Sequence, residues 1–528
     1  MSTSETFRQR RGFGSTAPDG QQQQPPQEQS DQQQQQQKTA DSKPTGTKRS
    51  LTIAIGGVLT LLGVASYTFM RQPSAAVDPV GLVATPEPTP LQLSTALESV
   101  ATKRVEAKKK LEGLSRTERR EEAKKLDVLT DLEVTAVLRA KEKSWQALGG
   151  ALQVDTNQVS SNDPIEDYLA SCDLRSSGAD GRLMVSVFDG HAGYQCAEQL
   201  AARMGPMVDA ALASISGDAA ADGSPALAKA VVRLKRDAGH DWDQVPMALT
   251  AAFMAMDREL VHESLAQFGK LSGDLEKMDE LLGPAVAGSC GLVAVVDRDA
   301  QEVVVANTGD SRALLGVRLK NGTWKAVRLS EDHTAKNKAE LARLARDHPG
   351  ETVIRHGRIL GGLMPTRAFG DSRYKWPLDV QKKLFPVLLS RGHRYATTPN
   401  DYASPPYVTA HPVIVRHRLG PQDRFIVVAS DGLYDQMSDK DIVDTVAQWY
   451  ESRGAEGKRA ATEDANAATH LIRAALETDN MGRRSAAYIQ QLLAIPPPLS
   501  RRFRDDISVA IVTLNDHADE AEEKIKSA

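Results

Sequence analysis

The chain reads Val-Phe-Asp-Gly-His-Ala-Gly at residues 187–193 and Val-Ala-Ser-Asp-Gly-Leu-Tyr-Asp at residues 428–435. Each stretch is the end of an apolar, strand-like run that stops at Asp-Gly. Such an end brings a carboxylate to the edge of a sheet, and the glycine lets the backbone turn and approach a neighbour closely. Two of them in one chain predict a shared cation. Asp-Gly is also an ordinary turn dipeptide, as we interpret it at 19–20, 180–181 and 222–223.

Further β-type runs predict the sheet structure. They lie at residues 183–188, 291–296, 302–306, 313–317, 324–329, 425–429 and 507–514. Asn321-Gly322 separates two of them and is a strong hairpin signal, so neighbouring strands are expected to be antiparallel. Helical stretches come in blocks, as at 226–260 and 439–450, which favours an α+β fold over a doubly wound parallel one.

Two more acidic pairs lie beside strand-like segments. Asp505-Asp506 directly precedes the last β-type run, and Glu166-Asp167 follows Pro164. Carboxylates, a backbone carbonyl and waters are the ligands that Mg²⁺ and Mn²⁺ prefer. The sequence therefore predicts a site for hard cations built from distant segments.

Composition excludes several classes of protein. The 528 residues carry a formal charge of −4, with both signs mixed, so no basic field indicates nucleic-acid binding. The three cysteines are few and show no CxxC spacing, which argues against a disulfide scaffold and a structural zinc site. They are Cys172, Cys196 and Cys290.

The N-terminal part predicts three segments before the globular domain. Residues 1–50 are rich in Gln and poor in large apolar side chains, which is typical of a disordered tail; the arginines near its start are compatible with a mitochondrial presequence. The uncharged run 51–70 has the length of a single transmembrane helix, and the basic residues before it favour a tail on the positive side of the membrane. Residues 71–129 are expected to form a Pro-rich linker and an exposed, charged helical spacer.

The globular domain is expected to begin at Thr130. Thr130-Asp131-Leu132-Glu133 has the spacing of a capping box and should open a short helix. We place the domain at residues 130–515 and a C-terminal tail at 516–528.

These motifs, in this order, resemble those of the metal-dependent (PPM-type) serine/threonine protein phosphatases. The resemblance extends to three further stretches, at residues 306–312, 329–333 and 367–371. Within that family the chain is most similar to the pyruvate dehydrogenase phosphatases, through residues 162–167, 360–371, 375–376 and 405–410 and the helical stretch 129–145. The resemblance implies a four-layer αββα sandwich, in which helices flank two central, mainly antiparallel sheets.

The resemblance also implies the main metal ligands. Asp189 would bridge two Mg²⁺ or Mn²⁺ ions, and the carbonyl of Gly190 would join one of them. Asp431 and Asp505 would hold the other. A phosphoserine or phosphothreonine would then be hydrolysed by attack of a hydroxide that bridges the ions.

The remaining implied roles are supporting ones. His191 falls on the family's proposed general acid for the leaving serine or threonine oxygen. Glu166 and Asp167 would act through waters bound to the metal ions. Asp371 and Asp435 would support a third, weaker ion.

One position departs from the broad family. Asn162 stands where most members have an arginine that grips the phosphate, and the pyruvate dehydrogenase phosphatases have asparagine there too. Because a neutral amide replaces a bidentate cation, phosphate binding should depend more on the metals and on nearby side chains. The long segments 195–288 and 372–406 exceed the family minimum and are expected to carry partner recognition.

Three functions of different classes follow. The first is an active, membrane-anchored phosphatase in mitochondria that acts on a phosphoprotein such as the pyruvate dehydrogenase complex. The second is an inactive adaptor with the same fold, and the third an unrelated metal hydrolase or nuclease. Insertion of residues 51–70 in the inner membrane with the tail in the matrix would turn the domain away from matrix pyruvate dehydrogenase. Cleavage, a reversed orientation or a different substrate would each resolve that conflict.

Overall fold

The computed structural model describes residues 87–514, apart from 176–180, 218–223, 239–242, 271–273, 455–463 and 480. The predicted tails 1–50 and 516–528 and the predicted membrane segment 51–70 lie outside the described residues. Within the described part of the chain, no helix is both long and apolar enough to cross a membrane.

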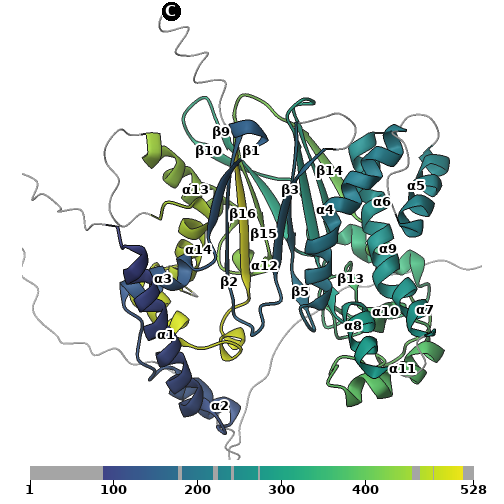
Figure 1. The fold of residues 1–528 in the computed structure, drawn as a ribbon, viewed down its shortest axis with the longest axis horizontal. Coiled ribbons are helices and arrows are strands. Elements are labelled where there is room, and N and C mark those ends of the chain that lie inside the picture. The colour runs from purple at the N-terminus through teal and green to yellow at the C-terminus, as the bar shows by residue number, and fades with distance from the viewer. Residues whose placement is uncertain are drawn as a thin grey trace, which may run out of the picture. The chain divides into compact units, whose positions relative to one another are not determined.

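Two antiparallel sheets form the centre of the fold (Figure 1). The six-stranded sheet has, in spatial order, β1 (Lys143–Ala147), β2 (Leu152–Val159), β16 (Ile507–Leu514), β15 (Asp423–Ala429), β9 (Arg312–Arg318) and β10 (Trp324–Arg328). The five-stranded sheet has β14 (Val413–Arg418), β8 (Glu302–Thr308), β7 (Gly291–Asp297), β4 (Arg182–Phe188) and β3 (Tyr168–Leu174). Shorter strands form two small sheets, one of β13 (Phe369–Gly370), β6 (Gly288–Ser289) and β5 (Gly190–His191) and one of β11 (Ile354–Arg355) and β12 (Arg358–Ile359).

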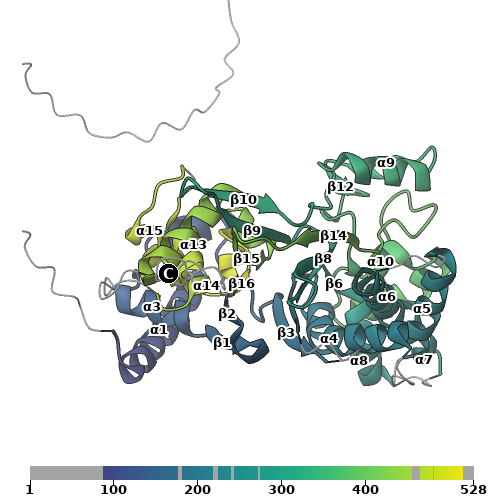
Figure 2. The same ribbon diagram turned by 90° about the horizontal axis from the view of Figure 1, so that it is seen from above.

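Some of the helices cover the outer faces of the two large sheets. The α-helices are α1 (Pro90–Leu111), α2 (Arg116–Ala123), α3 (Asp131–Arg139), α4 (Gln195–Ser216), α5 (Pro225–Ala238), α6 (Gln244–Arg258), α7 (Ser264–Phe268), α8 (Leu275–Val286), α9 (Lys338–Asp347), α10 (Ser372–Lys375), α11 (Leu378–Ser390), α12 (Asp431–Tyr434), α13 (Asp439–Gly454), α14 (Ala467–Glu477) and α15 (Ala486–Ala494). Short helices of other types are η1 (Leu148–Gly150), η2 (Glu259–Glu263) and η3 (Leu499–Arg502). Helices α3, α13 and α14 pack on the six-stranded sheet, whereas α4 and α6 pack on the five-stranded one, as Figure 2 shows from above.

Burial on both faces explains why most of the central strands are rich in apolar residues. A core of aliphatic side chains fills the space between the sheets, among them Val185, Leu292, Ile426 and Val512. Because helices cover the opposite faces, strands such as β7 and β16 are buried along their whole length. The structure thus confirms the predicted α+β fold with two antiparallel sheets between helical layers.

The seven predicted strands are all present, with ends that differ by a few residues at most. The predicted hairpin is also confirmed, since β9 and β10 pair through a turn in which Gly322 has a φ of 82°. The predicted helical stretch 226–260 consists of two helices, α5 and α6. In the two large sheets, four strands were not predicted: β1, β2, β3 and β14. The short strands of the two small sheets were not predicted either.

The charged segment before residue 130 is helical, but it is not exposed on all sides. Helix α1 packs against α3 and α15, and Val100 and Leu111 are buried. The sequence did not reveal this apolar face, because the buried residues lie a full helical turn or more apart and charged residues stand between them. The prediction that this helical spacer is exposed is therefore wrong for the face of α1 that packs against α3 and α15.

Glu133 links α1 to the start of α3. It forms the predicted capping box with Thr130, in which its side chain accepts from the Thr130 backbone N–H at 2.7 Å. The same carboxylate accepts from Lys103 Nζ at 2.7 Å and from Ser99 Oγ at 2.6 Å, both on α1. Burial alone would raise the pKa of Glu133, but these three donors lower it to about 2.

We expect Glu133→Gln to destabilise the protein by up to about 3 kcal/mol at pH 7, because the amide keeps the shape but loses the charge. A carboxylate whose folded pKa is about 2, below its ordinary 4.5, stabilises fully above pH 4.5 and loses this contribution as the pH falls towards 2. Urea unfolding of both proteins from pH 7 to pH 3 should therefore show a difference that shrinks on acidification. Glu118→Gln, which changes the exposed capping box of α2, is the matched control. A difference that is constant over this range would contradict the assignment.

Candidate metal centre

The antiparallel order of the sheets brings distant acidic residues to one edge of the sandwich. In the six-stranded sheet, β15 and β16 are neighbours, and Ala429 at the end of β15 pairs with Val509 near the start of β16. Asp431, which begins α12 after β15, and Asp505, which precedes β16, therefore lie at the same edge. Their separation in sequence has no bearing on their distance in the fold.

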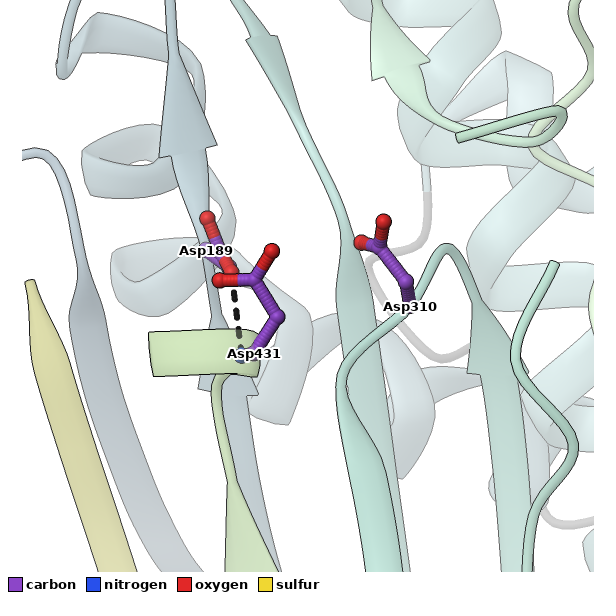
Figure 3. Close-up of side chains that lie close together, drawn as sticks. All are labelled: Asp189, Asp310 and Asp431. Carbon is purple, nitrogen blue, oxygen red and sulfur yellow. Dashed lines mark hydrogen bonds between the residues drawn. The ribbon is translucent and has the colours of Figure 1, made fainter. Parts of the chain in front are cut away.

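The five-stranded sheet supplies carboxylates at the same edge. Asp189 follows β4 and Asp310 follows β8. One carboxylate oxygen from each of Asp189, Asp310 and Asp431 lies within 4.8 Å of the other two (Figure 3). In addition, the backbone N–H of Asp431 donates to Oδ2 of Asp189 at 3.4 Å. The two Asp-Gly strand ends thus meet, one from each sheet.

The glycines of the two Asp-Gly pairs are required by close contacts of the backbone. A Cβ at Gly190 would lie 2.2 Å from the carbonyl oxygen of Glu166, and one at Gly432 would lie 2.0 Å from that of Asp506. Any other residue would push these segments away. Because neither glycine has a side chain, the Glu166-Asp167 and Asp505-Asp506 segments can lie directly against the two Asp-Gly strand ends. An ordinary turn would not require these close contacts.

The electrostatics of the cluster favour a cation. Burial and repulsion by Asp431, Asp167, Asp505 and Asp310 raise the pKa of Asp189 well above its ordinary value. Burial and repulsion by Asp310 and Asp505 likewise raise the pKa of Asp431. Burial also raises the pKa of Asp505, to about 6. Closely spaced, buried carboxylates of this kind are stable as anions only with a compensating positive charge.

The donor atoms fit a hard divalent ion. The site offers carboxylate oxygens and no cysteine or histidine among the three clustered side chains, which suits Mg²⁺ or Mn²⁺ better than zinc. Asp167 is buried nearby, and its Oδ2 has no hydrogen-bond partner. An unsatisfied buried oxygen beside other carboxylates is what a bound ion or its water would complete.

A cavity of about 410 Å³ opens onto the cluster. Asp189, Gly190, His191, Asp310, Asp431 and Asp505 line one side of it. Side chains from the segment after β11 line the other, including Arg358, Met364, Arg373 and Tyr395. The cavity gives a substrate access to the carboxylates.

The comparison with known proteins identifies the chain's relatives. A model of the protein phosphatase 2C family matches residues 153–482. The chain belongs to the protein phosphatase 2C family. Asp505 lies beyond the matched residues, so its place at the site rests on the geometry.

Individual phosphatases are similar over most of their length. A human protein named pyruvate dehydrogenase (acetyl-transferring) phosphatase 2, mitochondrial, is 32% identical over 453 residues, which cover 73% of this chain and 84% of that protein. A protein phosphatase 2C homolog of Schizosaccharomyces pombe is 35% identical over 388 residues, covering 69% and 80%. Among solved structures, a serine-threonine phosphatase 2C of Toxoplasma gondii is 22% identical, with a TM-score of 0.40 and coverage of 69% of this chain and 94% of that one. This protein phosphatase 2C is a metal-dependent serine/threonine protein phosphatase, and its substrate is a phosphoprotein.

Asp506 has a different place in the phosphatase from its neighbour Asp505. It is buried and its carboxylate accepts from the backbone N–H groups of Ser161, Asn162 and Glu166. It therefore fixes the loop that carries the other acidic pair, whereas Asp505 lines the cavity.

Asn162 also serves this loop. Its Nδ2 donates to Oδ2 of Asp506 at 3.1 Å and to Oε2 of Glu166 at 3.3 Å. Both hydrogens of the amide are thus directed at carboxylates within the loop. Burial raises the pKa of Glu166.

His191 lies at the cavity and is paired with Asp371. Its Nε2 is 2.8 Å from Oδ2 of Asp371, a residue held in the left-handed region with a φ of 52°. Burial lowers the pKa of His191, but Asp371, Asp310 and Glu166 outweigh it and the net shift is upward. The carboxylate of Asp371 thus supports a protonated imidazole.

Two residues of the site escaped the sequence analysis. Asp310 belongs to the cluster although only its surrounding motif was recognised, and its signal was the strand end Thr308-Gly309-Asp310. Arg501 lines the cavity and forms an ion pair with Asp505, four residues on. Asp435, in contrast, is exposed at the end of α12.

Proposed function

We propose that the carboxylate cluster holds two Mg²⁺ or Mn²⁺ ions and that phosphoserine and phosphothreonine side chains are hydrolysed beside them. Asp189 would bind both ions, the carbonyl of Gly190 one of them, and Asp431 and Asp505 the other. The observation that carries this proposal is the meeting of Asp189, Asp310 and Asp431 oxygens within 4.8 Å at the floor of a cavity. When bound, such ions neutralise the phosphate dianion and lower the pKa of water so that hydroxide is available near neutral pH.

The other acidic residues would support this site. We assign Glu166 and Asp167 to waters around the ions, because both lie in the loop that Gly190 admits. A third, weaker ion would be held by Asp310 with Asp371 or Asp435. Asp371 is the better candidate of the two, because it lines the cavity together with Asp310, whereas Asp435 is exposed at the end of α12.

His191 would act as the general acid. It would donate its proton to the serine or threonine oxygen as the P–O bond breaks, while Asp371 holds the ring and supports its charge. A positioned imidazole of this kind typically contributes about 10²–10⁴-fold to the rate.

We further propose pyruvate dehydrogenase, in mitochondria, as the substrate. Support comes from relatives whose names state this activity and location and from the arginines Arg8, Arg10 and Arg11. The catalytic domain would span residues 130–515, with α1 and α2 packed against it. The membrane anchor at 51–70 stays a prediction.

The test uses the full chain with a phosphoserine peptide. We expect Mn²⁺ to start turnover and excess chelator to stop it. Mn²⁺ at 100 times its dissociation constant should also stabilise the fold by about 2.7 kcal/mol, measured as a rise in melting temperature. Turnover of a nucleic acid instead of the peptide would favour a nuclease. A rise in melting temperature with no turnover would favour the adaptor.

A further inference from the structure

The resemblance to the phosphatase family implies a cation at position 162, but the residue there is Asn162, whose side-chain amide already has hydrogen-bond partners. The Asn162 amide donates to Asp506 and Glu166, and Asn162 is not among the residues that line the cavity. A phosphate dianion in the cavity therefore gains no charged donor from this position. Some other residue has to supply one if the phosphate is to be held by more than the metals.

Arg501 projects from a turn that is fastened to the segment just before Asn162. Ser500 Oγ donates to the carbonyl of Ser161 at 2.7 Å, and Arg504 Nη1 donates to that of Val159 at 3.3 Å. These bonds hold η3 against residues 159–161. Arg501 is therefore held close to the loop that carries Asn162.

The guanidinium of Arg501 lies in the cavity beside the carboxylate cluster, and not all of its N–H groups are used by Asp505. Its Nη1 is 2.7 Å from Oδ2 of Asp505, and its side chain is 47% exposed. It lines the same cavity as Asp189 and Asp431. A guanidinium has five N–H donors, so the bond to Asp505 leaves a fork that can bind phosphate oxygens in pairs.

The other arginines of the cavity are less well placed. Arg358 donates to the carbonyl of Gly362 at 3.1 Å, and Arg373 lies 5.5 Å from the centre of the Tyr374 ring. Among the described residues, neither forms an ion pair with a carboxylate that lines the cavity, whereas Arg501 pairs with Asp505. Arg358 and Arg373 therefore suit the rest of the phosphoprotein better than the phosphate.

We propose that Arg501 binds the phosphate group of the substrate and so takes the part of the arginine that is absent at position 162. The inference rests on the proposed function, because it places the phosphate beside the carboxylate cluster. In the absence of phosphate, the same guanidinium neutralises Asp505. Arg501 is then a substrate-binding residue.

The test measures phosphate binding directly. Inorganic phosphate is titrated by calorimetry into the full chain in saturating Mg²⁺, for wild type, Arg501→Ala, Arg501→Lys and Arg502→Ala. We expect Arg501→Ala to weaken phosphate binding about 10- to 100-fold and to raise KM for a phosphoserine peptide more than it lowers kcat. The phosphate affinity of Arg501→Lys should lie between those of wild type and Arg501→Ala, because lysine keeps the charge but lacks the planar fork of N–H donors.

Arg502 is the matched control because it is the next residue of the same turn and faces elsewhere. It lines a separate cavity with Leu111, Arg119 and Phe503. Arg502→Ala should bind phosphate within about twofold of wild type.

Two outcomes would overturn the proposal. One is phosphate binding by Arg501→Ala that equals wild type. The other is a parallel loss of Mg²⁺ affinity, which would show that Arg501 only positions Asp505. If wild type binds phosphate through Arg501 but hydrolyses no phosphopeptide, the proposed function fails while this inference stands.

Discussion

Asp189→Asn should lower the turnover of a phosphoserine peptide by at least about 1,000-fold and, in the absence of metal, raise the melting temperature of the protein. The loss follows because Asp189 is central to the cluster and is the residue proposed to contact both ions. A 1,000-fold loss corresponds to about 4 kcal/mol of transition-state stabilisation.

The gain in stability has the same origin. Burial and repulsion by Asp431, Asp167, Asp505 and Asp310 disfavour the charged form of Asp189 in the folded protein. Asparagine keeps the shape and removes one negative charge from this cluster, so the metal-free fold is relieved of repulsion. We expect a rise of a few degrees, and we expect Mn²⁺ to stabilise the variant much less than wild type.

The two measurements are steady-state kinetics in Mn²⁺ and thermal melts with and without chelator. Asp379→Asn makes the same chemical change on an exposed position of α11 and should leave both readouts unchanged. A variant that loses activity but melts below wild type without metal would mean that Asp189 is structural and not part of a repelling ion site.

In the two large sheets, the four strands that were not predicted all contain polar or charged side chains. Strands β1, β3 and β14 lie at sheet edges, where one side of the backbone is unpaired and polar side chains are tolerated. Strand β2 is internal, but Asp155 and Asn157 give it the composition of a loop. Their polar groups are satisfied by other elements: Asp155 accepts from the backbone of Ala467, and Asn157 donates to the carbonyl of Leu138. Partners so distant in sequence leave no local signal.

Candidate site residues could be predicted from the sequence where they lie at the end of a strand. Those that lie in a turn between elements could not. Asp189 and Asp431 were found from their Asp-Gly strand ends, and they meet as expected. Arg501 was overlooked because its part depends on how η3 is fastened to residues 159–161. The structural role of Asp506 could not be predicted either, because its carboxylate accepts hydrogen bonds from the backbone N–H groups of Asn162 and Glu166, which lie far away in the sequence.

His191→Gln should lower kcat on a phosphoserine peptide by about 10²–10⁴-fold and change the hydrolysis of p-nitrophenyl phosphate by less than about tenfold. The serine alkoxide is a poor leaving group that needs a proton, whereas p-nitrophenolate leaves without one. Glutamine keeps a hydrogen-bonding group beside Asp371 but has no proton of suitable acidity to give. The ratio of the two losses therefore separates proton donation from a general disturbance of the site.

The chain offers a matched control in a second histidine–carboxylate pair. His417 Nε2 lies 2.9 Å from Oδ2 of Asp423, between β14 and a neighbouring strand end, and neither residue lines the cavity. His417→Gln should leave both activities within about twofold of wild type. Asp371→Asn should reproduce part of the His191 effect, again on the peptide only, because the amide supports the protonated ring less well than the carboxylate does. Equal losses on both substrates for His191→Gln would assign His191 to metal or substrate positioning, and the proton would then have to come from another donor.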